Sequence, residues 1–400
     1  MTTLAGSEVV LGVTGGIAAY KACEIIRELR KEGANVVVIL TASGSQFITP
    51  LTLQTLSRNP VHTDLFNLIS ESDVGHISLA QRANLLLIAP ATANTIGKIC
   101  NGIADDLLST VAMATTAPIL LAPAMNNHMY ASAAVRENIE ALVERGVTFV
   151  EPGEGELACG ATGPGRLADT GKILEMARIM LAEKILEGKK VVVSAGPTAE
   201  DIDPVRFITN RASGKMGFAM AIAARRFGAD VTLVTGPTRL PDPPFLKVEH
   251  VRSAQEMGNA VAAAGENANV IVMAAAVADM RPLAPAARKI PKKELTEKID
   301  VVRTEDILAN LGELKRQRVL VGFAAETNDI EGRAREKLRN KNLDAIVAND
   351  VSRRDIGFDS DSNEVKVLFS DGTALDFVKA SKEAIAAAVL RAITVKFLRA

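Results

Sequence analysis

The chain has 400 residues, with 46 Lys and Arg against 47 Asp and Glu, and 48% of its residues are hydrophobic. This length favours two domains over one, and so apolar a composition excludes a mainly disordered protein. The net charge of −1, the 4% of aromatic residues and the lack of Trp argue against nucleic acid or an anionic membrane as a partner, because there is neither a strong positive field nor a supply of stacking side chains. A local basic site stays possible.

In chain order, the first half alternates short apolar runs with segments of helical periodicity. Strands are predicted over Val9–Val13, Asn35–Leu40, Leu85–Ala89, Pro118–Ala122 and Val147–Val150, and helices over Ile17–Glu32 and Ala131–Arg145. Uninterrupted apolar strands separated by helices are typical of a parallel sheet that is covered on both faces. The density of Gly and Pro in residues 151–166 then predicts a mobile loop or flap with no packed element.

A second α/β series follows a charged helix predicted over Asp169–Leu186, so we place the boundary near residue 187 and expect domains 1–187 and 188–400. Its predicted strands are Val191–Ser194, Asp230–Thr235, Val270–Ala274, Val319–Phe323 and Ala345–Ala348, and its helices are Lys215–Phe227, Arg333–Arg339 and Ser381–Phe397. Glu364–Phe369 and Ala374–Val378 flank Ser-Asp-Gly and predict a hairpin. The expected fold class is α/β, with two doubly wound, Rossmann-like domains.

The cysteines and the apolar runs bear on where the protein acts. Cys23, Cys100 and Cys159 are odd in number and widely spaced, which predicts neither a disulfide framework nor a Cys-rich metal site. The first eight residues lack the basic and apolar regions of a signal peptide. The longest apolar run, residues 83–93, is far shorter than the roughly 20 residues of a membrane-spanning helix. We therefore expect a cytoplasmic protein without a membrane partner.

Polar and Gly-rich motifs follow several predicted strands of the first half, where open α/β sheets bind ligands. They are Val13-Thr-Gly-Gly-Ile-Ala-Ala19, Gly75-His-Ile77, Pro90-Ala-Thr-Ala-Asn-Thr95, Asp105-Asp-Leu-Leu-Ser-Thr110, Pro123-Ala-Met-Asn-Asn-His-Met-Tyr130 and residues 155–166. Glycines after the first strand let backbone N–H groups approach a phosphate, and a tight turn without a ligand is the alternative. In this order the motifs resemble the flavin-binding cysteine decarboxylases, in particular the phosphopantothenoylcysteine decarboxylases, over residues 9–167.

That resemblance implies a flavodoxin-like flavoprotein domain that binds FMN. In the family, FMN oxidises the thiol side of the substrate to a thioaldehyde, CO₂ leaves to give an enethiol, and the reduced flavin returns the electrons. The matching catalytic residues are His76 as proton acceptor, Asn126 as hydrogen-bond partner of the substrate carboxylate, and Cys159 on the flap as the acid. The FMN residues that the resemblance implies are Gly15, Gly16, Ile17, Ser43, Thr92, Asn94 and Ser109.

The second half places a long polar and Gly-rich segment, residues 194–217, between a predicted strand and a helix, again where phosphates bind. Ala274–Pro282, the basic cluster Lys289–Lys293 and Gly322–Thr327 follow it, and Lys337 and Lys341 lie one helical turn apart. A solvated basic face is the alternative for these lysines. Together the motifs resemble the phosphopantothenate–cysteine ligases over residues 189–375.

This second resemblance implies that CTP activates the phosphopantothenate carboxylate as an acyl-cytidylate with release of pyrophosphate, and that the cysteine amine then forms the amide. Asn210 would stabilise the acyl-cytidylate and Lys289 would act in the activation step. Mg²⁺ would neutralise phosphate charge, through ligands that the sequence does not identify. The CTP site would comprise Ala275, Asp279, Lys289, Asp306, Ile307, Phe323, Lys337 and Lys341.

The two resemblances together imply a bifunctional enzyme of coenzyme A biosynthesis that converts 4'-phosphopantothenate and cysteine into 4'-phosphopantetheine. The trimeric contacts of the one family and the dimeric contacts of the other imply a homo-oligomer, and a dodecamer would satisfy both. Three alternatives stay open. They are a flavoprotein of the same fold with other chemistry, such as a flavin-modifying prenyltransferase, a regulatory flavin-binding subunit without turnover, and a ligase with a vestigial flavin domain.

Overall fold

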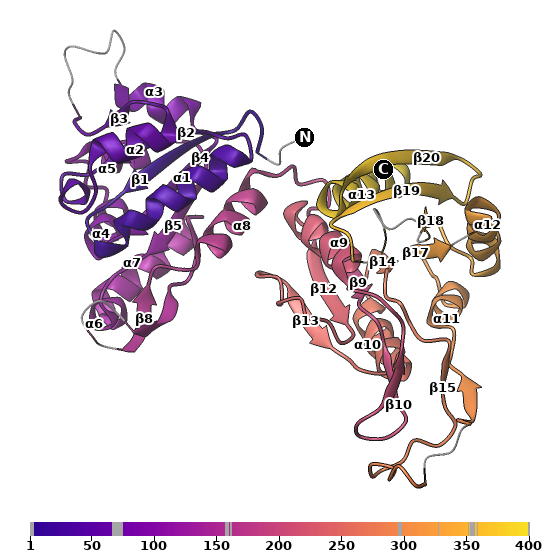
Figure 1. The fold of residues 1–400 in the computed structure, drawn as a ribbon. Coiled ribbons are helices and arrows are strands. Elements are labelled where there is room, and N and C mark those ends of the chain that lie inside the picture. Colours follow the sequence, from indigo (N-terminus) through magenta and orange to yellow (C-terminus); the bar gives the residue numbers. More distant parts are fainter. Residues whose placement is uncertain are drawn as a thin grey trace. The chain divides into compact units, whose positions relative to one another are not determined.

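The computed structural model describes residues 4–65, 75–156, 160, 162–294, 298–326, 328–350, 352, 357 and 359–398. The chain forms two compact units that divide between Ala182 and Glu183, each built on a sheet of largely parallel strands (Figure 1). The helix expected over Asp169–Leu186 ends at Leu181. Leu186 packs in the core of the second unit, where its N–H donates to the carbonyl of Phe227 at 2.9 Å.

The first unit has a six-stranded parallel sheet in the order β3-β2-β1-β4-β5-β6. Its strands are β1 (Glu8–Val13), β2 (Asn35–Leu40), β3 (Val61–His62), β4 (Leu85–Ala91), β5 (Ile119–Pro123) and β6 (Thr148–Phe149). The order reverses between β1 and β4, which confirms the predicted doubly wound topology. The loops after these two strands therefore begin side by side at the carboxyl edge of the sheet.

Helices cover both faces of this sheet. They are α1 (Ala22–Lys31), α2 (Pro50–Ser57), α3 (Gly75–Arg82), α4 (Ala93–Asn101), α5 (Leu107–Ala114), α6 (Asn127–Ala131), α7 (Ala133–Glu144) and α8 (Thr170–Leu181), with 3₁₀ turns η1 (Ile17–Lys21) and η2 (Gly44–Gln46). Apolar residues of α3, α4, α5 and α7 form the core on one face, while α1 contacts α2 and α8 on the other. The predicted helix 131–145 is interrupted at Ser132, because its extended backbone lets its hydroxyl accept the Val135 N–H and cap α7.

The prediction that residues 151–166 contain no packed element is wrong. They include an antiparallel pair, β7 (Gly153–Glu156) and β8 (Thr162–Arg166). Gly155, Gly163 and Gly165 have φ values of 145°, 155° and 137°, which residues with a Cβ rarely adopt, so the glycines permit this pair rather than prevent it. A Cβ on Gly165 would overlap the carbonyl of Met125, and the Met125 N–H donates to the Gly165 carbonyl at 2.9 Å. The base of the hairpin is thereby fixed to the loop after β5.

The second unit has an eight-stranded sheet in the order β13-β12-β9-β14-β17-β18-β19-β20. Its strands are β9 (Lys190–Ala195), β12 (Asp230–Thr235), β13 (Lys247–His250), β14 (Val270–Met273), β17 (Val319–Glu326), β18 (Ala345–Asp350), β19 (Ser362–Phe369) and β20 (Ala374–Ser381). In this order, the strands from β13 through β12, β9, β14 and β17 to β18 are parallel. Strands β19 and β20 form the predicted antiparallel hairpin at one edge. The order reverses between β9 and β14, so the second unit is doubly wound as well.

Figure 1 shows α9 (Lys215–Arg226) and α13 (Lys382–Phe397) side by side on one face of this sheet. The other face is covered by α10 (Ala254–Gly265), α11 (Ile307–Glu313) and α12 (Ile330–Asn340). Two short hairpins that the sequence did not predict are β10 (Ala199–Asp201) with β11 (Phe207–Thr209) and β15 (Met280–Pro282) with β16 (Val301–Arg303). The first touches the second through β10 and β15.

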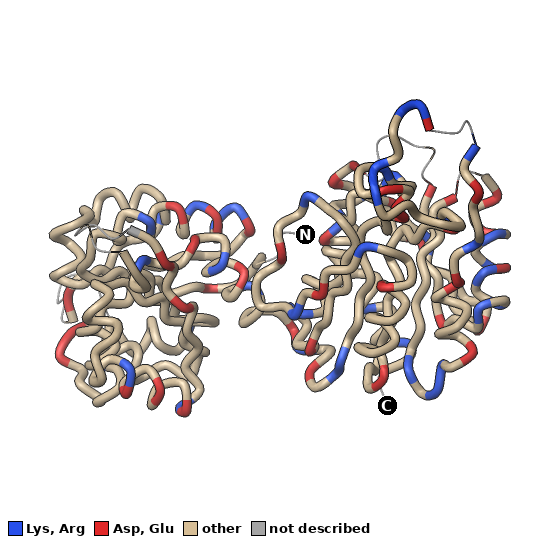
Figure 2. Tube along the Cα trace, turned by 90° about the horizontal axis from the view of Figure 1, so that it is seen from below, with Lys and Arg blue, Asp and Glu red and all other residues tan. Residues whose placement is uncertain are grey.

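Charge is mixed throughout, since Figure 2 shows positions of both signs interspersed along the trace of each unit. Within the described part of the chain, no helix is both long and apolar enough to cross a membrane.

The contact between α9 and β9 gives a stability prediction at Gly217. A Cβ there would lie 2.5 Å from the Cβ of Ala195 and 3.0 Å from the Ser194 carbonyl oxygen. Replacing Gly by Ala favours a helix by about 1 kcal/mol, but here the backbone must move apart to admit the methyl group. We expect Gly217→Ala to lower the free energy of unfolding by roughly 1–3 kcal/mol, measured by urea denaturation.

Gly258 in α10 supplies the matched control. A Cβ there would meet the nearest atom of Ile307 at 3.4 Å, which is an ordinary contact. Gly258→Ala should therefore leave stability unchanged or raise it by up to about 1 kcal/mol. Equal effects of the two substitutions would show that the approach of α9 to β9 does not require glycine.

Candidate active sites

The carboxyl edge of the first sheet brings together residues from three separate segments of the chain. The hydroxyl of Thr14, just after β1, donates to the Pro90 carbonyl at 2.7 Å and accepts the Thr92 N–H at 3.2 Å. A Cβ on Gly15 would overlap the side chain of Ser43, so the turn after β1 passes directly against the turn after β2. A Cβ on Gly16 would lie 3.9 Å from the methyl group of Thr92. The turns after β1, β2 and β4 thus form one continuous edge.

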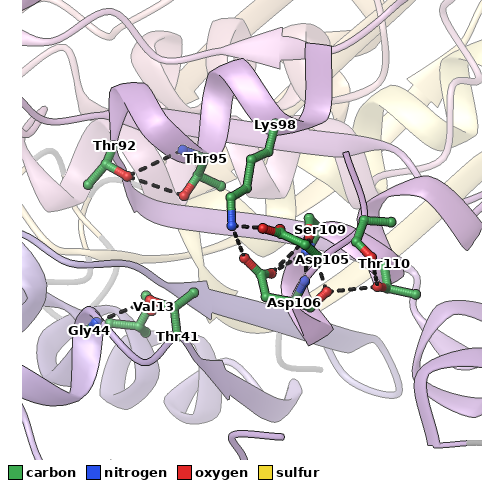
Figure 3. Close-up of polar contacts among 11 residues, drawn as sticks. Val13, Thr41, Gly44, Thr92, Thr95, Lys98, Asp105, Asp106, Ser109 and Thr110 are labelled. Carbon is green, nitrogen blue, oxygen red and sulfur yellow. Dashed lines mark hydrogen bonds and ion pairs between the residues drawn. The ribbon is translucent and has the colours of Figure 1, made fainter. Parts of the chain in front are cut away.

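The other residues expected at the flavin site lie on or near the same edge. Ile17 begins η1 and is 62% exposed, and Asn94 is exposed in the first turn of α4. Thr92 caps α4, with its hydroxyl 3.5 Å from the Thr95 N–H nitrogen and 3.2 Å from the Thr95 hydroxyl (Figure 3). Apolar and polar groups are therefore exposed together where the strand order reverses.

Ser109 differs from these residues, because its side chain is used within the protein. It is 2% exposed, and its N–H donates to the Asp106 carboxylate at 2.8 Å while its hydroxyl accepts the Asp106 N–H at 3.2 Å. This capping box starts α5. Ser109 is therefore expected to affect a flavin site by fixing where α5 begins.

Lys98 joins α4 to the start of α5. Its ammonium contacts the Asp105 carboxylate at 2.6 Å and the Asp106 carboxylate at 2.8 Å (Figure 3). These two hydrogen bonds raise the pKa of Lys98 despite its partial burial. Burial opposes ionisation of Asp106, but the bonds from Lys98 and Ser109 outweigh it and lower its pKa. The sequence motifs contained both aspartates but gave no sign of their partner.

The expected catalytic residues of the first unit stand on α3 and at the start of α6. His76 lies in the first turn of α3, and its Nδ1 is buried without a hydrogen-bond partner among the described residues, as is the Oδ1 of Asn127. The side chain of Asn126 caps α6 by accepting the His128 N–H at 2.8 Å. Cys159 lies outside the described residues. Buried polar atoms without partners are costly, so a bound ligand that pairs with them would stabilise the unit.

A cavity of about 900 Å³ lies at the carboxyl edge of the second sheet, on both sides of the reversal between β9 and β14. Residues 210–217 line it from one side, and residues 273–277 and 303–308 line it from others. The residues expected there from the sequence that do line it are Asn210, Ala275, Asp279, Asp306, Ile307, Phe323, Lys337 and Lys341. The structure therefore assembles in one cavity a set that spans more than a hundred residues of sequence.

Lysine–carboxylate pairs hold the α12 side of this cavity. The Lys337 ammonium lies 2.6 Å from the Glu326 carboxylate, and the Lys341 ammonium lies 2.8 Å from that of Asp306, which also caps α11. Burial opposes ionisation of both carboxyl groups. Bonds from Lys337 and Arg333 to Glu326, and from Lys341 and backbone N–H groups to Asp306, outweigh burial and lower both pKa values. On the other side, the amide of Asn210 donates to the Val277 carbonyl at 2.9 Å. Both sides of the cavity are thus fixed before any ligand binds.

Lys289 is the exception, because it is exposed and does not line the cavity. Its neighbour Ile290 is held by hydrogen bonds to Asp203 and Arg206, and we call this set of contacts the clamp. The side chain of Asp203 is fully buried. The Asp203 carboxylate accepts the Ile290 N–H at 3.2 Å and an Arg206 guanidinium N–H at 2.6 Å, and that guanidinium also donates to the Ile290 carbonyl at 3.2 Å. In Figure 2 the segment that carries Lys289, residues 288–294, is the blue stretch that ends at a red position, just before a grey trace.

Several polar residues that line the cavity are not identified by the sequence motifs. Lys215 lies within the Gly-rich segment 194–217, whereas four others lie far along the chain from it. No local sequence pattern joins these four to that segment, and only the fold brings them to it. The four are Arg303, Asn349, Asn363 and Lys382.

The clamp predicts that Asp203→Asn loosens the segment that carries Lys289. An amide cannot replace the charge-assisted bond to Arg206 and also accept all the remaining N–H groups, so the Ile290 N–H loses protection. Hydrogen exchange measured by mass spectrometry should become faster, on the order of tenfold, in residues 286–294. Asp201→Asn is the control, since Asp201 is partly exposed on the same hairpin and pairs with Arg252 instead. Unchanged exchange in the Asp203 variant would contradict the clamp.

The same clamp has a pH dependence of known sign. Burial opposes ionisation of Asp203, but hydrogen bonds from the backbone N–H groups of Val205, Ile290 and Arg206 outweigh it and hold its pKa below the ordinary 3.8. A carboxyl group with a lowered pKa stabilises the fold above its ordinary pKa and loses that contribution as pH falls through the lowered value. The clamp should therefore persist at pH 4 and open only in stronger acid.

Among the described residues, no group of three or more His, Cys, Asp and Glu side chains is arranged to hold a metal ion. Cys23 and Cys100 are free thiols, and burial raises the pKa of Cys23.

Comparison with known proteins covers both units. Residues 1–181 match the family described as Flavoprotein, and residues 186–396 match the family described as DNA/pantothenate metabolism flavoprotein C-terminal domain. The chain is 48% identical over 389 residues to the Coenzyme A biosynthesis bifunctional protein CoaBC of Bacillus subtilis (strain 168), and the match covers 96% of this chain and 96% of that protein.

Two solved structures are each similar to one part of the chain. The C-terminal domain of a Coenzyme A biosynthesis bifunctional protein CoaBC is 41% identical, covers 54% of this chain and 98% of its own, and has a TM-score of 0.47. A mutant PPC decarboxylase complexed with pantothenoylaminoethenethiol is 32% identical, covers 43% of this chain and 97% of its own, and has a TM-score of 0.39.

Proposed function

Because the chain belongs to the family of bifunctional coenzyme A biosynthesis proteins, we propose that it converts 4'-phosphopantothenate and cysteine into 4'-phosphopantetheine in two steps. The second unit would join cysteine to 4'-phosphopantothenate and would use CTP to activate the carboxylate. The first unit would decarboxylate the product with FMN. Both steps would take place in the cytoplasm. The observation that carries the proposal is the cavity of the second unit, which is lined by every residue expected for CTP and its acyl-cytidylate except Lys289.

In the ligation, a carboxylate oxygen of 4'-phosphopantothenate would attack the α-phosphorus of CTP. The bond from that phosphorus to the bridging oxygen breaks, and pyrophosphate leaves with the electron pair. The cysteine amine then attacks the acyl carbon, CMP leaves with the electrons of the carbon–oxygen bond, and the nitrogen loses a proton. Lys337 and Lys341 would turn from Glu326 and Asp306 toward the phosphates. Mg²⁺ would neutralise part of the negative charge of the phosphates.

Asn210 suits the acyl-cytidylate because its amide group already spans the two loops that flank the strand reversal. Lys289 lies outside the cavity, so its part in activation requires the clamped segment to approach, or a second copy of the chain to supply it. The clamp at Ile290 would then set where the lysine stands.

The first unit fits a flavin because its sheet edge exposes backbone at Gly15 and Gly16 beside Ser43 and Thr92, and because the buried Nδ1 of His76 needs a partner. Bound FMN would supply reversible two-electron oxidation of the substrate. Ile17, Asn94 and Ser109 complete the proposed FMN set. His76 would accept a proton, Asn126 would hold the substrate carboxylate, and Cys159 would return a proton at the end of the cycle.

We also propose a homo-oligomer, and specifically a dodecamer of trimeric flavin contacts and dimeric ligase contacts. Large apolar side chains are exposed near the flavin edge, among them Ile17 at 62% and Tyr20 at 60%, and water-exposed apolar groups close to a site suit a subunit interface. Native mass spectrometry should give twelve chains, and a monomer under the same conditions would contradict the assembly.

The overall reaction is tested in one vessel with the full-length protein, 4'-phosphopantothenate, cysteine, CTP and Mg²⁺. Mass spectrometry should detect 4'-phosphopantetheine, CMP and pyrophosphate. Accumulation of 4'-phosphopantothenoylcysteine alone would leave only the ligase, with a vestigial flavin unit. A protein that binds FMN and makes neither product would be a regulatory flavoprotein or one with other chemistry.

His76→Asn separates the two halves of the reaction. Asn is smaller than His, and its amide keeps a polar group near the position of the imidazole but cannot accept a proton at neutral pH. Decarboxylation should therefore slow by roughly 10²–10⁴-fold while ligation continues. The intermediate 4'-phosphopantothenoylcysteine should then accumulate. His128→Asn is the control, because His128 is exposed and contributes only its backbone N–H to Asn126. Equal decarboxylation by both variants would remove His76 from the mechanism.

A further inference from the structure

Two lysines line the ligase cavity from the face of the sheet that α9 and α13 cover. Lys215 is the first residue of α9, and Lys382 is the first residue of α13. Lys337 and Lys341 reach the cavity from α12 on the opposite face. We propose that Lys215 and Lys382 form an anion subsite for a phosphoryl group, either the diphosphate end of the nucleotide or the phosphate of the acyl substrate. This inference rests on the proposed ligase function.

Lys382 is a buried lysine in the wall of the cavity. It is 7% exposed, and its ammonium donates to the Gly357 carbonyl at 3.3 Å. Burial lowers its pKa and the charge of Lys215 lowers it further, whereas Asp361 and Asp359 act in the opposite direction. A buried ammonium costs free energy, and the positive end of a helix dipole adds to that cost at the first position of α13.

Lys215 repeats this arrangement at the neighbouring helix. Its ammonium lies 2.6 Å from the Asp361 carboxylate and 2.8 Å from the Asp359 carbonyl. The carbonyl of Asp361 in turn accepts the backbone N–H of Lys382 at 2.9 Å. The short segment before β19 therefore holds both helix starts together. The side chain of Asp361 is 91% exposed, so it can move aside when a stronger anion enters.

The start of α9 adds further donors. Its N-cap residue is Gly214, which has a left-handed φ of 80° and no side chain that could cap the helix. The first N–H groups of a helix find no acceptor within it, and Lys215, Met216 and Gly217, which carry these groups in α9, line the cavity. Two lysines and a helix start on one wall match the oxygens and the charge of a phosphoryl group.

The test measures ligand binding to the full-length protein by calorimetry, with pyrophosphate and 4'-phosphopantothenate as separate probes. Lys382→Met and Lys215→Met should each weaken one of these probes by about tenfold to a hundredfold, because a charge-assisted hydrogen bond is lost. Lys382→Arg keeps the charge and should retain most of the affinity. Lys379→Met is the matched control, since Lys379 is exposed on β20 and lies outside the cavity wall.

The outcomes separate the sources of the phosphoryl group. Weaker pyrophosphate binding alone assigns the subsite to the nucleotide, and weaker 4'-phosphopantothenate binding alone assigns it to the acyl substrate. Unchanged binding of both probes in both Met variants, with unchanged thermal unfolding, overturns the subsite. If Lys382→Met does not fold, the more exposed Lys215 still decides the question. A protein that binds pyrophosphate through these lysines but forms no cysteine adduct keeps the subsite and loses the ligase function.

Discussion

The reversal of strand order constrains both units of this chain. Between β1 and β4, and again between β9 and β14, neighbouring parallel strands send their following segments to opposite faces of the sheet. No crossover covers the edge at that point, so backbone and polar side chains of several loops meet there. Most of the residues proposed for the two reactions lie on loops at one of these edges, whereas Lys289 lies outside the cavity of the second unit. The helices outside the edges supply packing and the position of each loop.

At the second edge, three lysines are paired with carboxylates of the protein itself. Lys337, Lys341 and Lys215 each face a carboxylate, which keeps the ammonium groups in place at small electrostatic cost. A polyphosphate that bound here, as proposed for CTP, would therefore exchange one anion for another and would not have to order a flexible cation first. The same logic explains the capping box at Asp106, where Lys98 neutralises the carboxylate that starts α5. Preorganisation of this kind lowers the cost of binding.

The sequence allowed the sheet strands with long apolar runs to be predicted, because a strand buried on both faces leaves a pattern that needs no tertiary information. Short elements such as β10 and β15 escaped prediction, since three residues carry no periodicity. The family motifs located Asn210, Asp279 and Phe323, yet Lys382 stood outside every motif and enters the cavity only because α13 packs beside α9. Ser109 was assigned from its motif, but its hydroxyl hydrogen-bonds the backbone of Asp106, three residues away.

The glycine-built hairpin of β7 and β8 has a consequence for how related sequences are compared. At Gly155, Gly163 and Gly165 any side chain is opposed by backbone conformation, and at Gly165 it is opposed a second time by the Met125 carbonyl. Selection for folding alone would keep these positions invariant across long evolutionary times. Their invariance in an alignment would therefore record the geometry of the hairpin, and a catalytic role for this segment has to be established at positions where another amino acid would fit.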